Sequence, residues 1–153
     1  MQLSKLTPGM VVAGGRRTVT DREIVEFETR FSGSSDNPSE SARRTRTSRD
    51  LTASVWMICA IAQDLASRTE VGELWNGPLR VIERLSWCDS IRPGDELQLQ
   101  IEILDKRMST KGVSSWVRWH WTLATAVGVR ALDLTAGCLF EGSSIPNDQA
   151  LHQ

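Results

Sequence analysis

The chain has 153 residues, of which 40% are hydrophobic and 24% charged, which is enough for one substantial core and too few for two ordinary domains. Its net charge of −1 favours neither nucleic acid nor an anionic membrane as a partner. The most hydrophobic stretch, residues 51–62, is shorter than the roughly 18–20 residues that span a bilayer. We therefore expect one domain over residues 1–153, with a polar tail from about 143, and neither secretion nor membrane insertion.

The three cysteines, Cys59, Cys88 and Cys138, lie in apolar runs and form no CxxC pair. An odd number of such residues suits buried, reduced thiols better than disulfides or a zinc site. Reduced thiols are typical of a cytoplasmic protein, which is the expected location. No motif suggests a cofactor or a metal ion, and we expect neither.

Two helices are predicted in the first half of the chain. After Thr20-Asp21-Arg22-Glu23, apolar residues recur at spacings of three and four, as in a short amphipathic helix with a polar first turn. Residues 32–49 are rich in Ser, Gly, Asn, Pro, Thr and Arg, which predicts a loop. From Asp50, a plausible N-cap, residues 51–66 are apolar nearly all round, which predicts a helix buried on most of its faces.

The second half of the chain predicts consecutive strands. The clearest signal is the alternation of Leu97, Leu99, Ile101 and Ile103 with polar residues. Short turns such as Arg92-Pro93-Gly94-Asp95 join the strands, which we expect at 79–87, 97–103, 114–125 and 129–140. This order predicts an α+β fold in which a curved antiparallel sheet wraps around the central buried helix.

Residues 85–97 read LSWCDSIRPGDEL, and the predicted central helix opens with Ala53-Ser54-Val55-Trp56. These segments resemble MaoC-like acyl dehydratases and (R)-specific enoyl-CoA hydratases. The first is similar to the "lrW-xx-PVrPGDtL" stretch of that family, and the second to the "ASGW" that opens the central helix in one branch of it. Leu6-Thr7-Pro8-Gly9-Met10 also looks like the family's opening strand. The resemblance covers about residues 6–141 and implies the hotdog fold, in a lyase that acts on acyl thioesters of coenzyme A or acyl carrier protein.

The catalytic Asp/His pair of that family does not carry over. Members have D-x-N-P-x-H or D-P-x-P-F-H in the loop before the central helix. Anchoring the alignment on Asn37-Pro38 puts Ser35 in place of Asp and Glu40 in place of His. His120 has the place of an ordinary strand residue, and His152 lies in the tail. The remaining acid/base candidates are Asp36 and Glu40, which also suit a turn and a solvated charge.

The groups that would bind the thioester carry over from the family better than the groups that would transfer protons. The resemblance implies that backbone amides at Ala53, Ser54 and Val55 polarise the thioester carbonyl, which needs no particular side chain. Arginines are concentrated in the same loop and suit the phosphates of coenzyme A or of a carrier protein, or simply a solvated loop. These arginines are Arg43, Arg44, Arg46 and Arg49.

Three hypotheses therefore stand. The chain is a hydratase or dehydratase that uses a substitute base such as Glu40, with its activity lost or altered. It is a non-catalytic acyl-binding or structural subunit that pairs with an active hotdog paralogue. Or it is a hotdog thioesterase in which a loop carboxylate activates water. The fold favours the first hypothesis, and the loop sequence favours the second. Because members of the family usually pair two sheets edge to edge, the resemblance also implies a homodimer or heterodimer.

Overall fold

The computed structural model describes residues 3–31, 51–75, 79–109 and 114–141. Within these residues five strands form one antiparallel sheet in the order β1-β3-β4-β5-β2. The strands are β1 (Val11–Thr18), β2 (Val81–Trp87), β3 (Glu96–Met108), β4 (Ser114–Thr125) and β5 (Arg130–Glu141). The helices are the 3-10 turn η1 (Leu3–Lys5), α1 (Asp21–Phe31), α3 (Val55–Ser67) and α4 (Glu70–Leu74).

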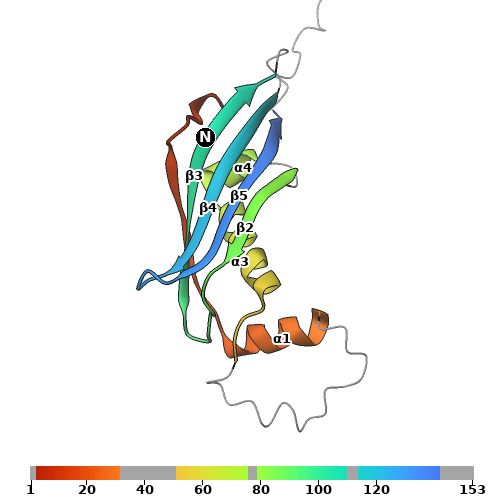
Figure 1. Cartoon of the computed structure of the whole chain (residues 1–153), viewed down its shortest axis with the longest axis vertical. Coiled ribbons are helices and arrows are strands. Elements are labelled where there is room, and N and C mark those ends of the chain that lie inside the picture. The colour runs from red at the N-terminus through yellow and green to blue at the C-terminus, as the bar shows by residue number, and fades with distance from the viewer. Residues whose placement is uncertain (1–2, 32–50, 76–78, 110–113, 142–153) are drawn as a thin grey trace, which may run out of the picture.

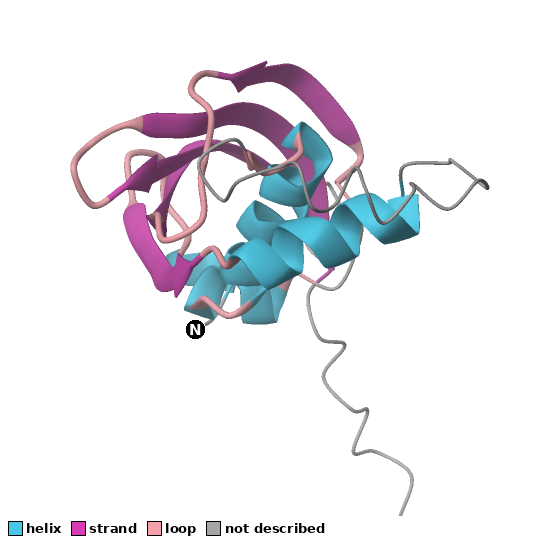
Figure 2. Ribbon diagram, turned by 90° about the horizontal axis from the view of Figure 1, so that it is seen from below, coloured by secondary structure: helices cyan, strands magenta, loops and turns pink. Residues whose placement is uncertain are grey.

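The sheet curves over α3, and α1 lies across one end of the sheet (Figures 1 and 2). In β4, Val117, Trp119, Trp121 and Leu123 alternate with partly exposed residues and are buried on the inner face. The buried side of α3, which includes Ile58 and Leu65, belongs to the same core. The predicted α+β fold, with a curved antiparallel sheet over a central helix, is confirmed. The prediction that this helix is buried on most of its faces is wrong, because Val55 and Trp56 are exposed and only the side toward the sheet is buried.

The central helix begins later than predicted. It starts at Val55, with Ser54 as its N-cap, whereas Asp50 lies outside the described residues. The Ala53 amide donates to the Ile91 carbonyl at 2.8 Å, which ties the approach to α3 against the segment before β3. The Ser54 hydroxyl accepts from the Trp56 amide, as a capping side chain does. A long-range hydrogen bond and a serine cap thus override the apolar pattern of residues 51–54.

The Pro-Gly turn forms as predicted. Gly94 has a φ of 91°, a value that side chains disfavour, and the Asp95 carboxylate accepts from the Arg92 amide at 2.9 Å. Helix α4 was not predicted. Its Gly72 packs so close to the end of α3 that a Cβ there would lie 2.1 Å from the Ala66 carbonyl oxygen.

The expectation of three buried thiols is wrong for Cys88, which is exposed because it follows the end of edge strand β2. Cys138 is buried, Cys59 is half-buried, and all three are free thiols. Burial raises the pKa of the Cys138 thiol to about 12, so it stays protonated. No helix among the described residues is long and apolar enough to cross a membrane.

Candidate functional site

The N-terminus of α3 presents unpaired backbone donors. Among the described residues, the amides of Ser54, Val55 and Met57 have no acceptor, while that of Ala53 is occupied by Ile91. Amides at the start of a helix point along the positive end of its dipole and stabilise a partial negative charge on an oxygen. Of the three residues predicted to bind a carbonyl, Ser54 and Val55 therefore keep a free amide, and Ala53 does not.

Two tryptophans flank this end of α3. Trp56 is 63% exposed and meets Trp87 of β2 edge to face, with ring centroids 5.7 Å apart. Burial raises the pKa of the nearby Cys59 thiol, against a weaker opposing contribution from its hydrogen bond with Trp87. A thiol with a raised pKa is a poor nucleophile at neutral pH. The wall beside the helix is thus aromatic and chemically inert.

The other predicted site residues lie outside the described residues. They are the carboxylates Asp36 and Glu40 and the arginines Arg43, Arg44, Arg46 and Arg49. Within residues 3–31, 51–75, 79–109 and 114–141, no group of three His, Cys, Asp or Glu side chains is arranged to hold a metal ion.

His120 lies on the outer face of the sheet, since its neighbours Trp119 and Trp121 point inward. Its Nε2 is 3.0 Å from Asp133 Oδ1, and the other oxygen of that carboxylate is 3.3 Å from Arg130. The sheet therefore separates this imidazole from α3. His120 cannot move a proton at the N-terminus of the helix.

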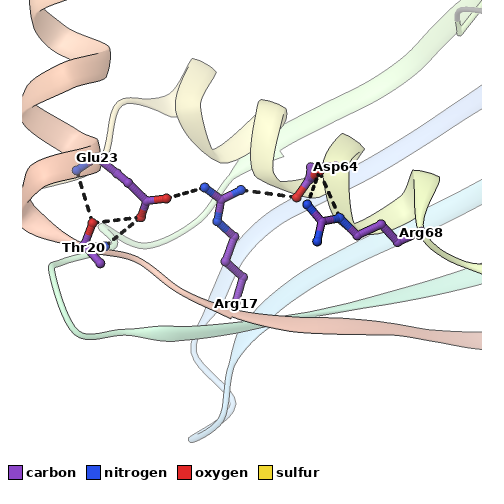
Figure 3. Close-up of polar contacts among 5 residues, drawn as sticks. All are labelled: Arg17, Thr20, Glu23, Asp64 and Arg68. Carbon is purple, nitrogen blue, oxygen red and sulfur yellow. Dashed lines mark hydrogen bonds and ion pairs between the residues drawn. The ribbon is translucent and has the colours of Figure 1, made fainter.

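A network of charged side chains ties β1 and α1 to α3 (Figure 3). Arg17 of β1 donates to Glu23 of α1 and, at 3.3 Å, to Asp64 of α3. Asp64 also accepts from Arg68 at 2.9 Å, and Glu23 accepts from the Thr20 amide and hydroxyl. The hydrogen bond from Arg17 holds the pKa of Glu23 below its usual value.

A pocket of about 300 Å³ lies beside this network, between α1 and α3. Its lining comes from β1, α1 and the first two turns of α3: Arg17, Glu23, Glu26, Phe27, Arg30, Phe31, Met57, Ala60 and Ile61. Met57, one of the residues with a free amide, belongs to this lining, so the pocket lies beside the first turn of α3. Five of the nine lining residues are apolar and four are charged.

The apolar residues of the predicted amphipathic helix include Phe27 and Phe31, but the sequence did not identify the pocket. One signal was available: Asp64 is the only charged residue in the apolar run 51–66, and a carboxylate in such a run needs a partner. Its partner Arg17 is 47 positions away, and no local pattern connects the two.

No family model and no curated protein matches the chain. Among solved structures it is similar to the MaoC-like dehydratase from Rhodospirillum rubrum, with a TM-score of 0.72 and 23% identity over 95% of this chain and 99% of that chain. The (R)-hydratase PhaJ1 from Pseudomonas aeruginosa matches with a TM-score of 0.61 and 16% identity, over 94% and 92% of the two chains. The chain has the hotdog fold.

A third hotdog structure comes from a complex of two proteins, the C-terminally truncated 3R-hydroxyacyl-ACP dehydratase HadBC from Mycobacterium tuberculosis. It has a TM-score of 0.59 and 16% identity, over 90% of this chain and 99% of that chain. The resemblance to MaoC-like dehydratases and (R)-hydratases, inferred from the Pro-Gly turn and the helix start, is thus borne out in the fold. Fold alone does not determine activity, which depends on the residues of the site.

Proposed function

We propose that the chain binds the acyl group of a thioester at the N-terminus of α3, as a hotdog protein of the dehydratase and hydratase type. The observation that carries the proposal is the set of amides of Ser54, Val55 and Met57, unpaired among the described residues, beside the α1–α3 pocket that Met57 helps to line. Such donors suit a thioester carbonyl, and the pocket suits the chain attached to it.

We further propose that hydratase activity is lost or weak. Hydration of a 2-enoyl thioester adds hydroxide to Cβ and a proton to Cα, so both a base for water and a proton donor are needed. Ser35 and Glu40 occupy the positions that the resemblance assigns to the Asp and His of the family. Because His120 lies beyond the sheet, Asp36 and Glu40 remain the candidates for any residual proton transfer.

The test of this loss is the hydration of crotonyl-CoA by the purified chain alone, followed through the absorbance of the enoyl thioester. General acid/base groups supply about 10²- to 10⁴-fold each, so we expect a rate at least about a hundredfold below that of a hotdog hydratase with an intact Asp/His pair. A rate equal to that of such a hydratase would refute the proposed loss of activity. If slow turnover is present and Glu40→Gln leaves it unchanged, Glu40 is not the substitute base.

A second proposal concerns the carrier. Arg43, Arg44, Arg46 and Arg49 pair with the phosphates of coenzyme A or of an acyl carrier protein, which explains four guanidinium groups within seven residues of a nearly neutral chain. Calorimetry tests it: replacing Arg43 and Arg44 by alanine should weaken binding of a coenzyme A ester far more than of the matching pantetheine ester. An equal loss for both esters would contradict phosphate binding.

We also propose that β2 pairs with a second hotdog chain, either another copy or a paralogue with the Asp/His pair. This edge strand exposes Val81 (46%), Ile82 (53%) and Trp87 (38%), next to Trp56, and exposed apolar edges are normally covered. Light scattering of the chain alone and of Ile82→Lys tests the homodimer. A monomeric wild-type chain would leave the heterodimer, which co-purification with the paralogue tests.

A further inference from the structure

The charges around the α1–α3 pocket do not cancel. Arg17 and Arg68 are matched by Glu23 and Asp64 in one closed network. On the exposed side of α1, Glu26 is 2.8 Å from Arg22, so this pair is neutral as well. The remaining charge in the pocket lining is that of Arg30.

The guanidinium of Arg30 has neither a hydrogen bond nor an ion pair with any described residue. It lies in the last turn of α1, where a cation is favoured by the helix dipole, but the dipole does not explain its place in a pocket wall. Arg30 is seven positions from Glu23 and three from Phe27, so all three share one face of the helix. A free guanidinium thus stands at the end of an apolar wall formed by Phe27 and Phe31.

The apolar wall and the amides of α3 define how a ligand runs through the pocket. The centroids of Phe27 and Phe31 are 4.6 Å apart, and Met57, Ala60 and Ile61 face them from α3. From Met57 to Ile61 the helix rises about 6 Å, which suits a short acyl chain. Building on the acyl-binding role proposed above, we propose that the acyl group of the ligand carries a carboxylate at its far end, which pairs with Arg30.

The test compares two matched pantetheine esters by calorimetry, one with a straight six-carbon acyl chain and one with a carboxylate on its terminal carbon. Pantetheine esters lack the nucleotide, so no carrier phosphate is present. We expect the carboxylate ester to bind roughly tenfold more tightly, as for a hydrogen-bonded charge pair, and Arg30→Gln to abolish this preference without weakening the straight-chain ester.

Two further variants make the result specific. Glu26→Gln removes the carboxylate four positions from Arg30 and should strengthen binding of the carboxylate ester. Arg107→Gln removes an equal charge from the far end of β3, where the side chain is 80% exposed, and should change neither ester. A preference that survives Arg30→Gln would overturn the proposal.

The failure of this inference is distinguishable from that of the proposed function. If both pantetheine esters bind equally well, the acyl site stands and the carboxylate preference is refuted. If Arg30→Gln weakens coenzyme A esters alone, the anion that Arg30 recognises is a phosphate of the carrier, and the acyl carboxylate is again refuted. If neither ester binds, the acyl-binding function fails as well.

Discussion

Two sides of α3 are closed in different ways. Toward the sheet, its buried side shares one core with the inward-facing Trp119 and Trp121. Trp75, which caps the end of α4, meets both rings edge to face, with centroids 5.2 and 6.0 Å apart. Toward α1, ion pairs of partly exposed side chains hold Arg17 to Glu23 and Asp64 and leave a pocket beside them. Close apolar packing resists any change of shape, whereas half-exposed ion pairs tolerate it. We therefore expect stability to be concentrated on the first side, while the proposed ligand site lies on the second.

The largest expected effect comes from the sheet side. Trp119 is fully buried and contacts Trp75, Trp121 and Phe140, so Trp119→Ala should cost about 3–5 kcal/mol in the free energy of unfolding, measured with urea. Trp119→Phe should cost much less, because it keeps an aromatic ring and removes an indole N–H that has no acceptor. If Trp119→Ala cost less than about 1 kcal/mol, the aromatic cluster would not be the main source of stability.

Trp56 is the matched tryptophan outside the core, with 63% of its surface exposed. Trp56→Ala should leave the stability of the isolated chain within about 1 kcal/mol of wild type. If β2 and Trp56 contact a second copy, the loss should vary with protein concentration, whereas the loss from Trp119→Ala should not. A concentration-independent loss of several kcal/mol from Trp56→Ala would contradict the contrast between the two positions.

The sheet side is also the part that the sequence predicts well. Strict alternation in β4 identifies its inner face, because a strand buried on one side must repeat every two residues. The Pro-Gly turn is equally local, since Gly94 alone supplies the positive φ. By contrast, the pocket combines Arg17, α1 and the first turns of α3. The ion pair between Arg17 and Asp64 beside it spans 47 positions, which no periodic pattern reveals.

The candidate site is predicted only in part for the same reason. A helix start is readable from sequence, and α3 begins within five residues of the predicted position. The sequence does not show which amides stay free, because this depends on the hydrogen bond between Ala53 and the distant Ile91. The carboxylates and arginines of 32–50 lie outside the described residues, so their roles remain predictions.

On the α1 side, neighbouring arginines provide a test of intermediate size. Arg17 bridges two carboxylates, with 34% of its side chain exposed. Arg16 is 63% exposed and, among the described residues, pairs with Glu96 alone, at 3.4 Å. Arg17→Met should destabilise the chain by about 1–2 kcal/mol, between the values for exposed and buried pairs. Arg16→Met should stay within about 0.5 kcal/mol. Equal urea midpoints for the two variants would show that the bridge contributes no stability.

The smallest effect is a pH dependence at Glu23. The pKa of Glu23 is lowered in the folded chain, mainly by the hydrogen bond from Arg17, against an ordinary value of 4.5. A carboxyl group with a lowered folded pKa contributes stability above its unfolded pKa and loses it as the pH falls through the folded pKa. The stability difference between wild type and Glu23→Gln should therefore be constant near neutral pH and shrink below about pH 4.5.

Urea unfolding of both proteins across this range measures the difference directly, and other titrating groups cancel because the two chains share them. Repeating the pair in an Arg17→Met background identifies the cause. Since Arg17 makes the largest contribution to the lowered pKa of Glu23, the acid-dependent part of the difference should nearly vanish there. If this acid-dependent part persists unchanged, the hydrogen bonds from Thr20 to Glu23 account for the lowered pKa. The ion pair with Arg17 then contributes little stability to the contact between α1 and α3.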